Sequence, residues 1–211
     1  MSEVVLYDYW RSSASYRVRI ALNLARIPYQ AVSIDLVTKQ NKTKNHLDRN
    51  PQGLVPVLNI DGSSFTQSLA IIEYLDTTRN LGLLPDTPAE RAQCQALAQS
   101  IAVDLHPICN LSVTTYAVEL TNSQETRDHW MTRFIEPGLA SFELLLAQFE
   151  QIPFSTGDHI SLADLCLIPQ IYNAHRWQAD YSRCKRIKRV FAACSNLPEF
   201  AAAHPDRVKP S

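Results

Sequence analysis

Apolar and polar residues alternate in two different ways along the first part of the chain. A short apolar run over residues 3–7 is typical of a strand. From residue 13 to residue 25, apolar residues instead recur at the spacing of one helix face. Pro28 disfavours helical geometry in the residue before it, so this helix should end by Ile27. Residues 29–34 alternate as a half-buried strand does, and the order strand, helix, strand predicts a βαβ unit with a parallel strand pair.

A hairpin pattern follows over residues 57–66. Its first half is mostly apolar, and an apolar run that closes with Asp61-Gly62 is a strong hairpin signal. Ser68 is next expected to cap an amphipathic helix. The order βαβ and then ββα predicts a small mixed sheet with helices, similar to thioredoxin.

Beyond this sheet every pattern is helical. Residues 77–88 are rich in turn formers and predict a linker. The fold class is therefore α/β plus all-α. We expect an N-terminal domain over residues 1–80, a linker over 81–87 and a helical domain over 88–211.

Several local signals mark the ends of the expected helices. Residues 87–90 place a cap, a proline at the first helical position and a capping-box glutamate in order. Pro107 should kink or end a helix near His106. A long amphipathic stretch is expected from Ser123 to about Gln151. Residues 161–164 form a variant capping box, which we interpret as structural.

Composition and charge narrow the class of partner. The chain has 211 residues, of which 45% are hydrophobic and 19% charged, as in a folded protein with a sizeable core. The formal net charge of −1 does not point to nucleic acid or to an anionic membrane, and the basic run over residues 183–189 is interpreted as a solvated helix face. No apolar run is long enough for a membrane span, and the N-terminus lacks the regions of a signal peptide.

The cysteines and histidines indicate neither disulfides nor metal. The five cysteines include no C-x-x-C pair, which favours a reduced, cytoplasmic compartment. The six histidines lack ligand spacing, so no metal is expected.

Ser12 and Ser13 are candidate anion-binding residues, because they stand where the first strand leads into the first helix. The first turn of a helix has unpaired N–H groups and a partial positive charge, which favour an anion. A serine hydroxyl there can donate to that anion, and a thiolate is one that would fit. The alternative is that either serine is only an N-cap.

Several motifs together resemble a known family, the soluble glutathione transferases, and within it the zeta class, the maleylacetoacetate isomerases. The resemblance covers essentially the whole chain. It is carried, in order along the chain, by residues 11–15, 17–22, 50–56, 67–75, 110–113 and 163–170.

This resemblance implies a fold and an activity. The implied fold is a thioredoxin-like domain followed by a helical bundle, in a homodimer. The implied reaction is the glutathione-dependent cis–trans isomerisation of maleylacetoacetate to fumarylacetoacetate in tyrosine and phenylalanine breakdown. Glutathione would act as a cofactor that is not consumed, and the substrate would be a small dicarboxylate.

The resemblance also implies roles for individual residues. Val55-Pro56 matches a cis-proline turn that aims the Val55 backbone at the peptide part of glutathione. The implied catalytic residues are Arg11, Ser12, Ser13 and Arg176, with the arginines for substrate carboxylates. The implied glutathione contacts are Ser12, Ser13, Ala14, Ser15, Asn41, Val55, Pro56, Gln67, Ser68, His106, Asn110 and Ser112.

One departure from the family pattern concerns Ala14. The zeta pattern usually has a cysteine there, and its replacement leaves the role of Ser12 intact but puts in doubt reactions that use the cysteine. Tyr7 and Tyr9 are rivals to Ser12, because other classes use a tyrosine hydroxyl near this strand. The serine motif fits better, and both tyrosines are interpreted as packing or wall residues.

Other functions remain open. Maleylpyruvate is an alternative substrate, although relatives with an arginine pair after the His-Pro segment differ from Asn110-Leu111-Ser112 here. A general transferase that conjugates small electrophiles, including α-halo acids, would use the same site. A glutathione-fold binding protein without catalysis is the alternative from another class.

Overall fold

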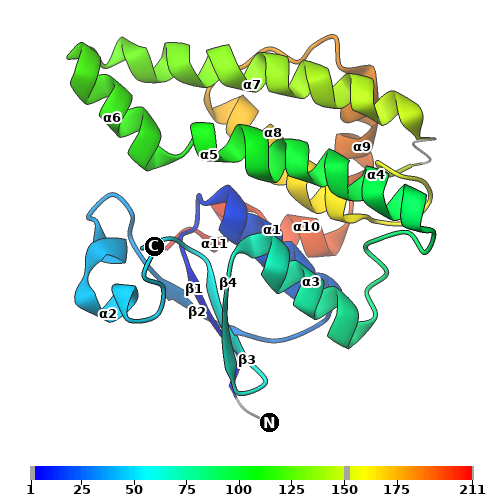
Figure 1. Cartoon of the computed structure of the whole chain (residues 1–211), viewed down its shortest axis with the longest axis horizontal. Coiled ribbons are helices and arrows are strands. Elements are labelled where there is room, and N and C mark those ends of the chain that lie inside the picture. Colours follow the sequence, from blue (N-terminus) through cyan, green and yellow to red (C-terminus); the bar gives the residue numbers. More distant parts are fainter. Residues whose placement is uncertain (1–2, 150–152, 211) are drawn as a thin grey trace. The chain divides into compact units, whose positions relative to one another are not determined.

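The computed structural model describes residues 3–149 and 153–210 (Figure 1), which pack as two units. The first unit comprises Met1–Leu81 and Leu197–Ser211, and the second comprises Gly82–Asn196. The expected domain ranges, 1–80 and 88–211, stay a prediction. The packing units differ from them mainly at the C-terminus, which returns to the first unit.

The first unit is built on a sheet with the strand order β2-β1-β3-β4. Strand β1 pairs with β2 in parallel and with β3 antiparallel, and β3 pairs with β4 antiparallel. The predicted βαβ unit and hairpin are therefore confirmed. The expectation of a half-buried second strand is wrong, because β2 is an edge strand whose residues are mostly exposed. The strands are β1 Val5–Asp8, β2 Gln30–Ser33, β3 Val57–Ile60 and β4 Ser63–Thr66.

Helices cover this sheet, and α1 packs against both α3 and α10. The helix α1 ends at Leu24, which confirms the expected stop before Ile27. Two predictions are corrected at α3. Ser68 is its first helical residue while Gln67 occupies the cap position, and the helix continues to Arg79, into the stretch expected to be linker. The helical elements of this unit are α1 Ser13–Leu24, η1 Gln40–Lys42, α2 Lys44–Leu47, α3 Ser68–Arg79, α10 Pro198–Ala203 and α11 Pro205–Val208.

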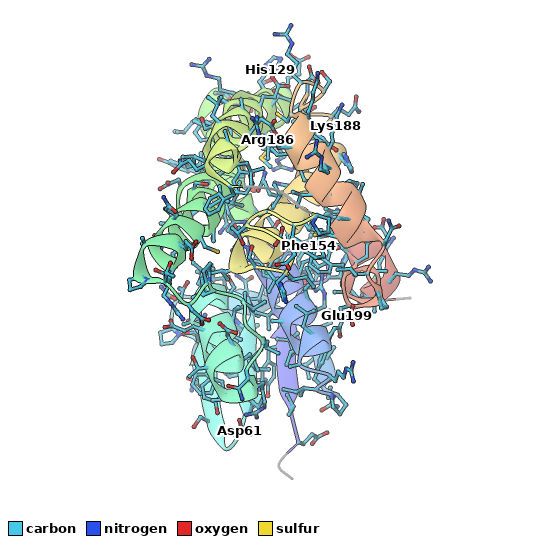
Figure 2. All side chains as sticks on the ribbon, turned by 90° about the vertical axis from the view of Figure 1, so that its right-hand side faces the viewer. Asp61, His129, Phe154, Arg186, Lys188 and Glu199 are labelled. Atoms are coloured by element: carbon cyan, nitrogen blue, oxygen red, sulfur yellow. The ribbon has the colours of Figure 1, made fainter. Side chains whose placement is uncertain are left out.

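Side chains of α1 hold the C-terminal segment against the first unit. The Nε atom of Arg19 donates to the carbonyl of Ala203 (3.0 Å), and Asn23 donates to the carbonyl of Glu199 (2.8 Å), which Figure 2 labels. The same guanidinium forms an ion pair with Asp8 (2.7 Å), and both side chains are buried. These buried polar contacts explain why the last residues pack with the first unit.

The second unit is helical, and its buried helix α8 packs mainly against α4. Arg186, labelled in Figure 2, lies in the first turn of the basic helix α9, and its backbone N–H donates to the carboxylate of Glu143 in α7 (3.0 Å). Among the described residues the helical elements of this unit are α4 Pro88–Gln99, the π turn η2 Ser100–Leu105, α5 His106–Ile108, α6 Leu111–Thr121, α7 Glu125–Leu145, η3 Leu146–Gln148, α8 Leu162–Arg176 and α9 Lys185–Ser195.

Most of the local helix signals are confirmed. Thr87 caps α4, and the capping box of residues 161–164 is formed by Ser161 and Asp164. Helix α5 ends directly after Pro107, at Ile108, as expected. The long helix α7 begins at Glu125, not at Ser123, because Gln124 takes the cap position. Gln151, the expected end of that stretch, lies outside the described residues.

Candidate active site

Ser12 stands at the N-cap of α1, directly beyond the end of β1. Its backbone is extended, and its Oγ accepts a hydrogen bond from the N–H of Ser15 (3.2 Å). The N-cap interpretation is therefore confirmed. The cap role does not exclude anion binding by Ser12, because a hydroxyl oxygen that accepts from an N–H keeps its own hydrogen to donate. Ser12 is partly exposed, so a bound anion could accept hydrogen bonds from both this hydroxyl and the free N–H groups of the first turn.

The residues after Ser12 differ in how far they can reach a ligand. Ser13 is nearly buried and begins the helix, whereas Ala14 is half-buried. The side chain of Ser15 is fully buried, and its Oγ has no hydrogen-bond partner among the residues that the structure describes. Ser15 supports the site through its backbone N–H, and a direct contact with glutathione stays a prediction for all three.

Arg11 is held against two aromatic rings beside Ser12. Its Nη2 donates to the hydroxyl of Tyr9 (3.0 Å), and its guanidinium carbon lies 4.7 Å from the ring centroid of Trp10. The hydroxyl of Tyr9 is thus engaged with a cation, and the ring of Tyr7 is covered by Arg49 at 4.4 Å. This arrangement agrees with both tyrosines as wall residues and with Arg11 as a preorganised cation.

The start of α3 forms a second anion-favouring position in the same unit. Ser68 is buried, and its Oγ accepts from Nη1 of Arg17 (3.2 Å). Because a guanidinium can only donate, the hydroxyl hydrogen of Ser68 is left for another acceptor. Gln67 is exposed in a left-handed conformation (φ 67°), and its amide donates to the side chain of Gln52 (2.8 Å). A carboxylate would find a helix start, a hydroxyl and a buried cation here.

The loop before β3 contains the expected cis peptide bond between Val55 and Pro56, which confirms that prediction. Val55 is almost fully buried and leads directly into the strand. Asn41 donates its side-chain amide to the carbonyl of Gly53 (2.7 Å). A contact between Asn41 and glutathione stays a prediction, but its Nδ2 is engaged within the protein.

Four predicted site residues lie in the second unit. Arg176 is the exposed last residue of α8, with its guanidinium carbon 5.3 Å from the ring centroid of Trp177. His106 opens α5 directly after the π turn. Asn110 is at the cap position of α6 without a side-chain cap bond, and Ser112 is exposed in the first turn of that helix. The roles of these four residues stay predictions.

The cysteines of the chain are unsuited to act as nucleophiles. All five are buried and free. Burial raises the pKa of the Cys109 thiol to about 11, and it also raises the pKa of Cys94, Cys184 and Cys194. A protonated thiol is a poor nucleophile. Thiol chemistry in this protein would therefore need a thiol from outside the chain.

Sequence reasoning missed the buried polar residues that support the site. In the sequence Arg17 is only part of a motif, although it is 2% exposed and donates to Ser68. Asn50 is likewise only part of a motif there, and His46 belongs to none, although both are buried and bond to the backbone next to Val55. The signal for Arg17 was available, since an arginine among apolar residues of a helix must find a buried partner. The bonds of His46 and Asn50 depend on a loop conformation that the sequence pattern does not define.

Two kinds of feature, a metal-binding cluster and a membrane-spanning helix, are not found among the described residues. Within residues 3–149 and 153–210, no group of three or more His, Cys, Asp or Glu side chains could hold a metal ion. In the same part of the chain, no helix combines the length and apolarity needed to cross a membrane.

Comparisons with known proteins identify relatives over the full length. Residues 2–77 match the family model of the glutathione S-transferase N-terminal domain. The maleylacetoacetate isomerase of Rhizobium meliloti (strain 1021) is 51% identical over 99% of each chain. A solved maleyl pyruvate isomerase, described as a bacterial glutathione S-transferase of the zeta class, superposes with a TM-score of 0.94 at 35% identity, covering 98% of this chain and 99% of that one. The maleylacetoacetate isomerase of Anaeromyxobacter dehalogenans 2CP-1, solved with dicarboxyethyl glutathione and citrate, gives a TM-score of 0.87 at 36% identity, covering 99% and 98%.

Proposed function

Because this chain belongs to the zeta class of the glutathione transferase family, together with the maleylacetoacetate isomerases, we propose that it is a glutathione-dependent isomerase that converts maleylacetoacetate to fumarylacetoacetate. This step belongs to the breakdown of tyrosine and phenylalanine. The observation that carries the proposal is the first turn of α1, where Ser12 caps the helix and keeps a hydroxyl hydrogen to donate.

The residues present fit glutathione as the cofactor. Two helix starts in the first unit offer hydroxyl and N–H donors, one at Ser12 and one at Ser68. The buried thiols of the chain cannot supply the nucleophile. When bound, glutathione supplies a thiolate that adds to the activated cis double bond and is eliminated after rotation to the trans form.

The contribution of Ser12 is sufficient in magnitude without a general base. A hundredfold gain in the thiolate fraction of a cysteine-like thiol needs about 2.7 kcal/mol of preferential stabilisation. A helix start contributes about 0.3–2 kcal/mol, depending on burial. A hydrogen bond to a charged group adds about 1.5–3 kcal/mol. Ser12 and the first turn of α1 together contribute about 1.8–5 kcal/mol, a range that includes the required value.

Other residues of the first unit would hold the ends of the tripeptide. Ser68, polarised by Arg17, is proposed to donate to the α-carboxylate of the γ-glutamyl group, with Gln67 as a side-chain partner. The backbone of Val55 is proposed to pair with the cysteinyl part. Asn41, His106, Asn110 and Ser112 remain proposed contacts whose partners on glutathione are not assigned.

The dicarboxylate substrate requires cations. Arg11, held between Tyr9 and Trp10, is proposed to bind one carboxylate, since a guanidinium matches a carboxylate in a two-point contact. Arg176 is proposed to bind the other. The dicarboxyethyl glutathione and citrate in the Anaeromyxobacter dehalogenans enzyme support anionic ligands in a relative of this chain.

The test is a proton NMR time course with maleylacetoacetate and a catalytic amount of glutathione. We expect the cis vinyl signals to give way to those of the trans isomer while free glutathione stays constant. A fall in free glutathione with formation of a thioether would instead identify a conjugating transferase. Absence of turnover with retained binding to a glutathione column would identify a binding protein.

Maleylpyruvate is the second candidate substrate, because the relative with a TM-score of 0.94 is a maleyl pyruvate isomerase. Parallel measurements of kcat/KM for the two maleyl acids separate these functions.

We also propose that the protein is a cytoplasmic homodimer. The five free, buried cysteines support a reducing compartment, and sedimentation would test the dimer.

A further inference from the structure

One segment of the first unit holds the backbone that precedes Val55. The carbonyls of Gln52, Gly53 and Leu54 each accept a hydrogen bond from a side chain of residues 41–50. The contact to Gly53 is short, at 2.7 Å from Nδ2 of Asn41. A loop whose carbonyls are bonded one after another in this way has little freedom to change conformation.

The carbonyl of Leu54 is the most heavily bonded of the three. The Nε2 atom of His46 and the Nδ2 atom of Asn50 both lie 3.0 Å from it. A carbonyl only accepts, so Nε2 of His46 must carry a hydrogen. The His46 side chain is 1% exposed, and no residue in the described part of the chain bonds to its Nδ1. The whole buried imidazole thus makes a single directed hydrogen bond, and that bond ends on the peptide group that joins Leu54 to Val55.

The backbone at Gly53 also packs closely against Asn41 and Lys42. Gly53 has a φ of +64°, and a Cβ built there would lie 2.8 Å from Nζ of Lys42 and 2.9 Å from the carbonyl oxygen of Asn41. Only glycine allows both this conformation and this approach. Two independent features, the bonded carbonyls and the close contact, therefore fix the loop against residues 41–50.

We propose that His46 and Asn50 are positioning residues, which hold the Leu54 carbonyl so that the Val55 backbone is ready to pair with the peptide part of glutathione. The proposal rests on the proposed function, since it assumes that Val55 contacts glutathione. Neither side chain needs to touch the cofactor. Their bonds keep the peptide group in one orientation before binding, so that the cost of ordering the loop does not reduce affinity.

The test compares two substitutions at His46. His46→Leu removes the donor, whereas His46→Gln keeps an N–H donor on a side chain of similar reach. We expect His46→Leu to raise the Kd and KM for glutathione about tenfold, the factor expected from one lost buried hydrogen bond. We expect kcat at saturating glutathione to stay within about twofold, because the reacting groups are unchanged. His46→Gln should recover most of the affinity, and Asn45→Ala, an exposed neighbour on α2, should match the wild type.

A matched variant separates positioning from general destabilisation. Ile72→Val removes one methylene from a buried residue of α3 and should lower the melting temperature without changing the Kd. The proposal is overturned if His46→Leu binds glutathione as the wild type does, if His46→Leu and His46→Gln lose affinity equally, or if Ile72→Val raises the Kd as much as His46→Leu. A wild-type protein that fails to bind glutathione would contradict the proposed function itself. A wild type that binds, with variants that bind equally well, contradicts only the positioning role.

Discussion

At the scale of single residues, Ser12 has two roles that substitution can separate. Its Oγ accepts from the N–H of Ser15 as a cap, and its hydrogen is proposed to stabilise a thiolate. In Ser12→Ala we expect kcat/KM for isomerisation to fall about 10–100-fold, because a hydrogen bond to a charged group is lost. The pKa of the bound glutathione thiol should rise, as measured by its ultraviolet absorbance during a pH titration.

The control for this experiment is Ser12→Asp. Aspartate is a good N-cap, so the helix should keep its stability. Its carboxylate cannot donate a hydrogen bond at neutral pH and repels a thiolate, so activity should fall at least as far as in Ser12→Ala. If Ser12→Asp retains wild-type turnover, the capping role alone accounts for Ser12.

Arg176 allows a test of substrate charge. In Arg176→Ala we expect KM for the maleyl dicarboxylate to rise about tenfold, the effect of losing one charge-assisted pair. Conjugation of a neutral electrophile should change little, since it offers no carboxylate. Arg189→Ala, at an exposed position of α9, is the matched control. Equal losses on charged and neutral substrates would remove the carboxylate role of Arg176.

Which residues the sequence could predict depends on how far apart the interacting partners lie. Ser12 and the cis bond before Pro56 belong to short motifs with local geometry, and the structure places both as expected. The bonds of Arg17 to Ser68 and of His46 to Leu54 join separate segments. Such contacts depend on tertiary packing, which hydrophobic periodicity does not encode at the level of single atoms.

At the scale of elements, helix ends that are defined by local polar residues were predictable. The cap at Thr87 and the capping box at Ser161 form because a capping side chain and its partner lie three residues apart. The start of α7 lies two residues beyond the expected Ser123, at a cap residue, Gln124, whose side chain makes no cap bond within the described part of the chain. The prediction that β2 is half-buried is also wrong, because an edge position depends on the strand order and not on the strand's own sequence.

The box at α8 gives the prediction for this scale. The Oδ1 atom of buried Asp164 accepts from the N–H of Ser155 (2.9 Å), and Oδ2 accepts from the N–H of Ser161 (2.7 Å). In Asp164→Ala we expect the free energy of unfolding to fall by about 2–4 kcal/mol, because two buried donors lose their acceptors. Guanidinium unfolding followed by circular dichroism measures this loss.

Asparagine should not rescue this position, although it has the same shape. One carboxylate oxygen would become an NH₂ group that faces an N–H donor. We therefore expect Asp164→Asn to lose at least about 1 kcal/mol as well. Full stability in Asp164→Asn would mean that only one of the two oxygens matters to α8.

At the scale of the whole chain, the return of the C-terminal segment was the feature least accessible to sequence reasoning. Its helical pattern placed it with the helical residues that precede it. Its partners, Arg19 and Asn23, are far away along the chain and donate to backbone carbonyls, which every sequence offers. A contact of this kind leaves no signature in the residues that accept it.

Arg19 links the two ends of the chain through its buried ion pair with Asp8, its bond to the Trp10 carbonyl and its bond to the Ala203 carbonyl. In Arg19→Met we expect the free energy of unfolding to fall by about 3–5 kcal/mol, because Asp8 is left as a buried charge without its partner. Asp8→Asn should also destabilise the protein. The double variant should lose less than the sum of the two, since it no longer buries an unpaired charge.

The exposed pair of Lys44 and Asp48 is the control for this double-mutant cycle, because its contact is similarly short (2.6 Å against 2.7 Å) without burial. We expect a coupling energy of about 0.2–1 kcal/mol there, as for other exposed ion pairs. Urea unfolding measures both cycles under one set of conditions. The double variant at Arg19 and Asp8 should not recover fully, because the carbonyls of Trp10 and Ala203 still lose their donor. If the losses in free energy of unfolding at Arg19 and Asp8 are additive, the hydrogen bonds to these two carbonyls, and not the ion pair, account for the contribution of Arg19 to stability.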